Sequence, residues 1–214
     1  MKPIYSEPQF IQQFAFELTS FIGRKFLKRR SRIKPISKPL LLDIGGGENF
    51  TDGWVHVDFF RTWIRRFWKQ RLIKQCPEVE TDLRYPLKCD DNIVDGIYSC
   101  HTLEHLYPNH AYNLIEELFR ILKPGGWFRI IVPELKEENC LHFRYRAEEI
   151  GDLTQNYGHH SVWDKELLSA TLKSYGFIHI KSVEFGKEGS DKRLIKEESN
   201  RKIGSLTIEA QKPL

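Results

Sequence analysis

The chain has 214 residues, of which 40% are apolar and 29% charged, a composition typical of one globular domain with an appendage. No apolar run approaches the ~20 residues that a membrane-spanning helix needs, and the N-terminus lacks the pattern of a cleaved export signal. The four cysteines include no C-x-x-C pair, which favours reduced thiols over disulfides or a structural zinc. We therefore expect a cytoplasmic protein.

The net charge of +4 is distributed unevenly along the chain. Residues 1–38 hold nine Lys and Arg against two acidic residues, so the rest of the chain has a net charge of −3. A second basic run, residues 61–74, has six positive charges, no acid and interleaved aromatic residues. Such runs attract phosphates, anionic lipids or acidic partners. We predict a basic N-terminal extension over 1–38 and a main domain over 39–214.

Within the extension, residues 9–28 place apolar side chains at steps of three and four, as an amphipathic helix does. The basic end of this segment suits the C-terminus of a helix. We expect the helix to pack on the main domain. The alternative is a helix that binds a partner or lies on a membrane, with residues 9–30 in peripheral contact with the inner face of that membrane.

Short apolar runs alternate with helical patterns over the main domain. Helices are predicted at 110–122, where Asn109 can cap the start, and at 165–174. Strands are predicted at 40–44, 54–58, 79–83, 93–99, 127–132, 177–180 and 205–210. This alternation is typical of an α/β fold with a doubly wound, mostly parallel sheet.

The first predicted strand ends in glycines. Asp43-Ile-Gly-Gly-Gly47 lets a ligand approach the backbone closely, because glycine has no Cβ in the way. Asp58 closes the second predicted strand, where a carboxylate can accept both hydroxyl hydrogens of a ribose. Taken singly, these features are equally compatible with a tight turn and a surface carboxylate.

Five motifs follow one another along the main domain: D-I-G-G-G at 43–47, V-D at 57–58, T-D-L at 81–83, D-D-N-I-V-D-G-I-Y-S-C-H-T-L-E-H-L at 90–106 and R-I-L-K-P-G-G-W at 120–127. Their order resembles class I S-adenosylmethionine-dependent methyltransferases. The resemblance is strongest to the small bacterial type 11 group, several members of which are linked to sugar and glycan pathways, and it extends over residues 39–214.

The resemblance implies a Rossmann-like, seven-stranded sheet with its last strand antiparallel and helices on both faces. It also implies S-adenosylmethionine as cofactor and S-adenosylhomocysteine as product. The cofactor-binding residues that it implies are Asp43, Gly45, Gly46, Gly47, Asp58, Asp82, Leu83, Ser99 and His101. One departure from the family pattern is the short span between Gly47 and Asp58, which leaves little room for the helix that usually follows the glycine loop.

The stretch H-T-L-E-H at 101–105 has the H-x-x-E-H spacing of certain zinc enzymes. Those enzymes hold the spacing within one continuous helix, whereas here it follows a predicted strand and precedes Pro108. We therefore predict no metal site. His101 is expected at the carboxyl edge of the sheet, where open α/β folds bind ligands, and Glu104 and His105 are expected to support the loop.

Methyl transfer from a sulfonium needs an aligned acceptor in a dry pocket, and a hydroxyl or ammonium acceptor must also lose a proton. The candidate bases are His101, Glu134 and His160, with His159 as an alternative to its neighbour. Each is also compatible with an ordinary surface role. Arginines in 141–146 can engage an anionic acceptor.

The sequence thus predicts a methyltransferase that acts on a small-molecule or glycan-type acceptor by O- or N-methylation. The basic stretches 24–38 and 61–74 leave RNA methylation as an alternative, which the slightly acidic main domain disfavours. A second alternative is a module that binds cofactor or membrane without turnover. The sequence does not indicate an oligomeric state.

Overall fold

The structure is a computed structural model that describes residues 7–26, 31–35, 38–47, 49–60, 77–134, 159–187, 189–197 and 204–214. Side chains are described from residue 14 onward. Two features singled out in the sequence lie outside the described residues: the basic run at 61–74 and the arginines at 141–146.

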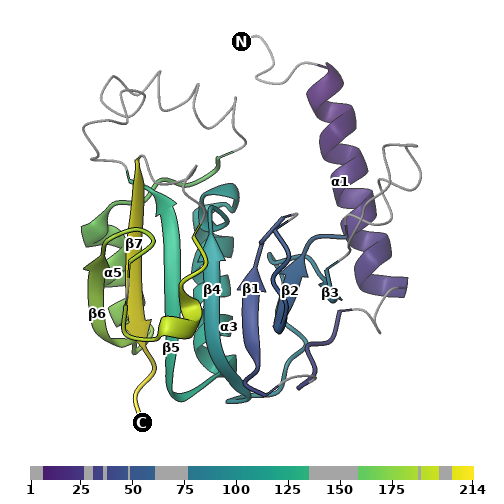
Figure 1. Ribbon diagram of the computed structural model, residues 1–214. Coiled ribbons are helices and arrows are strands. Elements are labelled where there is room, and N and C mark those ends of the chain that lie inside the picture. Colours follow the sequence, from purple (N-terminus) through teal and green to yellow (C-terminus); the bar gives the residue numbers. More distant parts are fainter. Residues whose placement is uncertain are drawn as a thin grey trace, which may run out of the picture.

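Within the described residues, seven strands form one sheet in the order β3-β2-β1-β4-β5-β7-β6 (Figure 1). The strands are β1 (Leu41–Ile44), β2 (Trp54–Asp58), β3 (Val79–Glu80), β4 (Val94–Cys100), β5 (Leu122–Pro133), β6 (Ile178–Val183) and β7 (Ser205–Gln211). Strands β1 to β5 pair in parallel, whereas β7 runs antiparallel to both β5 and β6. The predicted mostly parallel sheet with a reversed last strand is confirmed.

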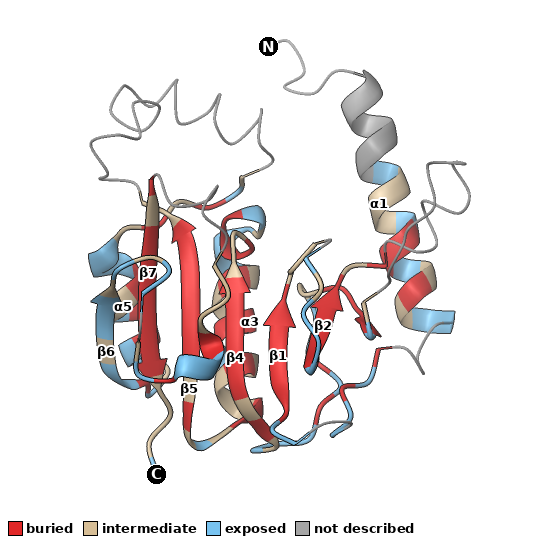
Figure 2. Ribbon diagram, in the orientation of Figure 1, coloured by how far each residue is buried: buried red, intermediate tan, exposed pale blue. Residues whose placement is uncertain are grey.

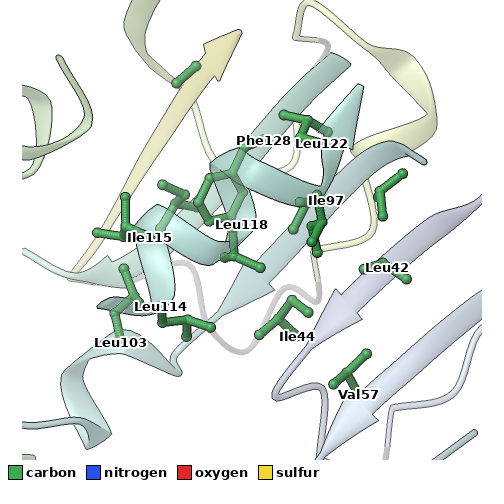
Figure 3. Packing of buried hydrophobic residues seen from close by; sticks show 14 of the residues in the cluster. Leu42, Ile44, Val57, Ile97, Leu103, Leu114, Ile115, Leu118, Leu122 and Phe128 are labelled. Atoms are coloured by element: carbon green, nitrogen blue, oxygen red, sulfur yellow. The ribbon is translucent and has the colours of Figure 1, made fainter. Parts of the chain in front are cut away.

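Two α-helices, α3 (Pro108–Ile121) and α5 (Lys165–Ser174), pack on one face of this sheet. Between α3 and the sheet lies a core of aliphatic and aromatic side chains (Figure 3). The inward residues of α3 recur at helical spacing and are almost fully buried: Ala111, Leu114, Ile115, Leu118 and Ile121. Burial of this stripe holds α3 on the sheet, because the hydrophobic effect scales with the apolar area removed from water.

The start of α3 differs from the prediction. The helix begins at Pro108, its N-cap is Tyr107, and no side chain caps it, so the predicted cap by Asn109 is wrong. Proline fits the first helical position because its missing N–H would have no intrahelical partner there and its φ is already helical.

The opposite face of the sheet is covered, among the described residues, by the connection between β6 and β7, which contains the short helix η3 (Lys192–Leu194). Leu194 packs over Gly96, where a Cβ would lie only 2.9 Å from the leucine side chain. Arg129 of β5 is fully buried beneath this connection. Its guanidinium donates to Glu209 of β7 at 2.6 Å and to Glu197 of the connection. This ion-pair triad fastens the connection to the sheet.

Figure 2 shows the consequence of this double covering: β1, β4, β5 and β7 are buried over most of their length, whereas β6 at the edge is largely exposed. The central strands therefore have little contact with water except where they end.

The helix predicted in the N-terminal extension is confirmed as α1 (Glu7–Phe26), which lies beside the β3 edge of the sheet (Figure 1). Small, polar and aromatic side chains of this helix make the contacts with the rest of the protein. Ser20 donates to Asp82 at 2.5 Å, and Gly23 lies so close to Phe60 that a Cβ would be 2.5 Å from its ring. None of the described helices combines the length and hydropathy that crossing a membrane requires.

Replacing Arg129 with Met should lower the free energy of unfolding by about 3–5 kcal/mol, because it leaves two buried carboxylates without their cation. Urea denaturation followed by circular dichroism measures this loss. The matched control is Arg32→Met, which removes an exposed ion pair with Asp90 and should cost no more than about 1 kcal/mol. Equal costs for the two variants would show that the buried triad does not fasten the connection.

Candidate active site

The site forms where three neighbouring strands end. β1 pairs in parallel with β2 on one side and with β4 on the other, so Ile44 lies beside both Val57 and Ser99. The loops that leave these strands therefore meet at one edge of the sheet, where open α/β folds bind ligands.

The glycine loop after β1 is tightly bound to β2. The Gly45 N–H donates to the Val57 carbonyl at 2.8 Å, and the Gly47 N–H donates to the Asp58 carboxylate at 3.0 Å. Gly45 has a φ of +72°, and a Cβ there would lie 2.3 Å from Thr102 Oγ1. A Cβ at Gly46 would lie 2.3 Å from the carboxylate of Asp43. Glycine is therefore required by both conformation and space.

Asp58 ends β2 and is 8% exposed. Besides the Gly47 N–H, its carboxylate accepts the N–H of Phe59 at 2.6 Å. These two backbone contacts, one to each oxygen, orient the Asp58 carboxylate.

Asp43 is 1% exposed and forms an ion pair that the sequence did not indicate. Lys196, from the connection that covers the second face, donates to Asp43 Oδ2 at 2.5 Å, and His56 Nε2 lies 3.9 Å from the same oxygen. Asp43 Oδ1 has no hydrogen-bond partner among the described residues. Burial raises the pKa of Asp43 above its ordinary value, although the Lys196 ammonium acts in the opposite direction.

Asp82 and Leu83 follow β3. Burial opposes ionisation of Asp82, but hydrogen bonds from Arg84 and Ser20 outweigh it and lower the pKa of this carboxyl. Asp82 therefore helps to hold α1 on the domain, and Leu83 packs partly buried against the core. The predicted contact of these two residues with a cofactor stays a prediction.

Ser99 is buried within β4 and donates to the Ile44 carbonyl at 3.3 Å. His101 follows the strand with a φ of +53°, a conformation uncommon for residues other than glycine. Its Nε2 lies 3.0 Å from Ser205 Oγ, and its Nδ1 lies 3.0 Å from Glu104 Oε1. The predicted position of His101 at the carboxyl edge of β4 is thus where the structure places it.

The remaining candidate bases lie on two segments. Glu134 follows β5 and forms an isolated parallel bridge to Trp163. The exposed ring of His160 stacks on Tyr107 with the ring centres 4.3 Å apart, and the half-buried ring of His159 lies 4.9 Å from that of His105. Burial lowers the pKa of both His159 and His160.

The strand order is that of the Rossmann-like fold found in methyltransferases. Residues 42–130 match the family model described as a methyltransferase domain. This part of the chain is therefore similar to the methyltransferase domain of that family.

Solved structures support the fold. The chain is similar to phosphoethanolamine N-methyltransferase 2 of Haemonchus contortus in complex with S-adenosyl-L-methionine, with 16% identity and a TM-score of 0.54 over 100% of this chain and 61% of that one. A complex of the same enzyme with phosphomonomethylethanolamine and S-adenosylhomocysteine is 18% identical, with a TM-score of 0.55 over 94% of this chain and 57% of that one. A SAM-dependent methyltransferase from Archaeoglobus fulgidus is 20% identical, with a TM-score of 0.53 over 95% of this chain and 98% of that one.

The chain thus spans about three fifths of the Haemonchus contortus enzyme, 61% and 57% in the two structures. At these identities the likeness concerns the fold alone. A comparison with curated protein sequences finds no match.

The glycine loop can be tested with two matched substitutions. Gly53 also has a positive φ, of +81°, but no atom lies within 4 Å of a Cβ built there. Gly53→Ala should therefore cost about 1 kcal/mol of folding free energy, from backbone strain alone. Gly45→Ala adds the collision with Thr102 and should cost about 2–4 kcal/mol. Denaturant titration of both variants measures the difference; equal costs would show that Thr102 does not confine the loop.

Proposed function

We propose that the protein transfers a methyl group from S-adenosylmethionine to a small-molecule or glycan-type acceptor, by O- or N-methylation. The observation that carries this proposal is the glycine loop after β1 bound to the Asp58 carboxylate, in a chain with a matching methyltransferase domain.

The described residues fit this cofactor. Asp58 is oriented by two backbone N–H groups at the end of β2, where a carboxylate can accept hydrogen bonds from ribose hydroxyls. The buried Asp43 Oδ1, which lacks a partner among the described residues, suits an ammonium group such as that of the methionine portion. Gly45 and Gly46 let the loop backbone pack directly against Thr102 and Asp43, which fixes the course of the loop at this edge of the sheet.

When bound, the cofactor supplies an electrophilic methyl group on a sulfonium. The work left to the protein is to align the acceptor, to exclude water and, for hydroxyl or ammonium acceptors, to remove a proton. His101 is the first candidate for the base that removes the proton, since it directly follows the end of β4 and its neighbour Thr102 touches the glycine loop. Glu134 and His160 are the other candidates.

A small acceptor agrees with the surface beside His160. There an open hollow of about 250 Å³ is lined mostly by apolar and aromatic side chains: Pro108, Tyr112, Ser161, Val162, Trp163 and Leu167. The structurally similar Haemonchus contortus enzyme is named as a methyltransferase of a small molecule, phosphoethanolamine. The glycan-type acceptor rests on the sequence resemblance to the type 11 group.

Asp58→Asn should weaken binding of S-adenosylmethionine by about 10- to 100-fold, because the amide loses the charge that strengthens hydrogen bonds to ribose hydroxyls. Isothermal titration calorimetry measures the affinity, and circular dichroism shows whether the variant folds. The control is Asp52→Asn, at an exposed position of the neighbouring loop.

Unchanged affinity of Asp58→Asn would show that Asp58 does not hold the ribose. Absence of binding by the folded wild-type chain would overturn the cofactor assignment. Transfer of radioactivity from methyl-labelled cofactor to components of a cell extract then identifies the acceptor; label in RNA would favour the alternative of RNA methylation.

We further propose that α1 contacts an anionic membrane surface. Its residues Phe14, Leu18 and Phe21 follow one another along one face of the helix at spacings of four and three, and they are 61%, 46% and 52% exposed. Lys25 continues this face, with its ammonium 5.4 Å from the centre of the Phe21 ring. Apolar side chains beside basic ones suit the interface of a bilayer with anionic headgroups.

The opposite side of α1 is the one that docks on the domain. Phe16 stacks on Phe59 with ring centres 4.3 Å apart, and Ser20 donates to Asp82. The helix therefore stays attached while its apolar stripe faces outward. In the sequence, Lys28, Arg29 and Arg30 follow directly and add positive charge.

The double substitution Leu18→Glu, Phe21→Glu should weaken sedimentation with vesicles of phosphatidylcholine and phosphatidylglycerol by about tenfold or more, because each change removes apolar surface and adds negative charge. The matched control is Ile178→Glu, an exposed apolar residue of β6 that should leave binding unchanged. Equal sedimentation of wild type and double variant would refute the membrane contact.

A further inference from the structure

A second cluster of potential ligands lies at the same edge of the sheet, apart from the glycine loop. Glu104 and His105 belong to the short helix η1 (Leu103–His105), which follows β4, and His159 comes from the segment before α5. One ligand atom from each of these three side chains lies within 4.8 Å of the other two. The three ligand atoms are therefore close enough together to approach one metal ion.

Within this cluster, the environment of the Glu104 carboxylate favours a bound cation. The residue is 1% exposed, and neither carboxylate oxygen has a hydrogen-bond partner among the described residues. His101 Nδ1 lies 3.0 Å from Oε1 without forming a hydrogen bond to it. A buried carboxylate without hydrogen-bond partners is costly, and coordination to a cation is one way to compensate this cost.

Hydrogen bonds fix the two segments to each other. The Glu104 carbonyl accepts the N–H groups of His160 at 2.6 Å and Ser161 at 3.1 Å. The Ser161 hydroxyl donates to the Leu103 carbonyl at 3.0 Å and accepts the Trp163 indole N–H at 3.0 Å. The segment that carries His159 is therefore anchored on η1 by contacts that do not depend on a metal.

We propose that Glu104, His105 and His159 bind one divalent transition-metal ion. Two imidazoles and one carboxylate suit ions such as Zn²⁺, Fe²⁺ or Co²⁺, whereas Mg²⁺ and Ca²⁺ prefer sets made of oxygen alone. Three protein ligands leave a coordination position open for an oxygen of water or of another molecule.

This proposal reverses the interpretation of H-T-L-E-H from the sequence. The zinc-enzyme spacing pairs His101 with His105 along one helix, and that helix is absent from the described residues around this motif. In the structure His105 is joined instead by His159, which the chain supplies much later, while the other side of His101 lies against Ser205.

The test titrates Co²⁺ into the full-length chain without cofactor, by calorimetry and visible absorption. Wild type should bind one ion, with a spectrum that shows imidazole and carboxylate ligands and no thiolate charge-transfer band. Glu104→Gln and His159→Ala should each weaken Co²⁺ binding by at least about tenfold. The matched control is His179→Ala, an exposed histidine of β6, which should bind as wild type does.

Melting temperatures distinguish a ligand from a structural support. Without metal, Glu104→Gln should melt at the same temperature as wild type or higher, because the substitution removes a buried charge. Co²⁺ should raise the melting temperature of wild type but not that of Glu104→Gln.

Absence of Co²⁺ binding by wild type, or unchanged binding by Glu104→Gln or His159→Ala, would overturn the site. Because neither the ligand nor the readout involves methyl transfer, these outcomes are independent of whether the proposed function holds.

Discussion

The candidate site depends on one constraint, the parallel pairing of β1 with β2 on one side and with β4 on the other. It brings the ends of three strands into one row and thereby places the glycine loop, Asp58 and His101 next to one another. None of these residues needs to be near another in sequence. Any slip of register would separate the Gly47 N–H from the Asp58 carboxylate that it now contacts.

The same edge is coupled to the far end of the chain through buried charge. Arg129 binds Glu197 in the connection between β6 and β7, and the adjacent Lys196 reaches Asp43 at the start of the glycine loop. In this way the connection closes the second face of the sheet and at the same time neutralises the carboxylate at the site. Folding of the last strands and formation of the loop around Asp43 are therefore linked.

Local patterns in the sequence were sufficient to predict the strands, the helices α3 and α5, and the glycine loop. Each of these is encoded by apolar spacing or by glycines within a few residues. The contacts of Lys196 with Asp43 and of Arg129 with Glu197 were not predictable, since they join residues 153 and 68 positions apart without any motif. The packing of α1 on the main domain was predicted, but the contacts of Ser20 and Gly23 were not, because hydrophobic periodicity does not identify small and polar contact residues. The grouping of Glu104 with His159 likewise depends on a long-range contact.

A crystal structure of the protein with S-adenosylhomocysteine tests most directly whether this edge is a cofactor site. The ribose hydroxyls should lie within hydrogen-bond distance of the Asp58 carboxylate, with the methionine portion against the glycine loop that begins at Gly45. A ligand bound elsewhere, or ribose hydroxyls that lie beyond hydrogen-bond distance of the Asp58 carboxylate when the ligand is present, would contradict the assignment.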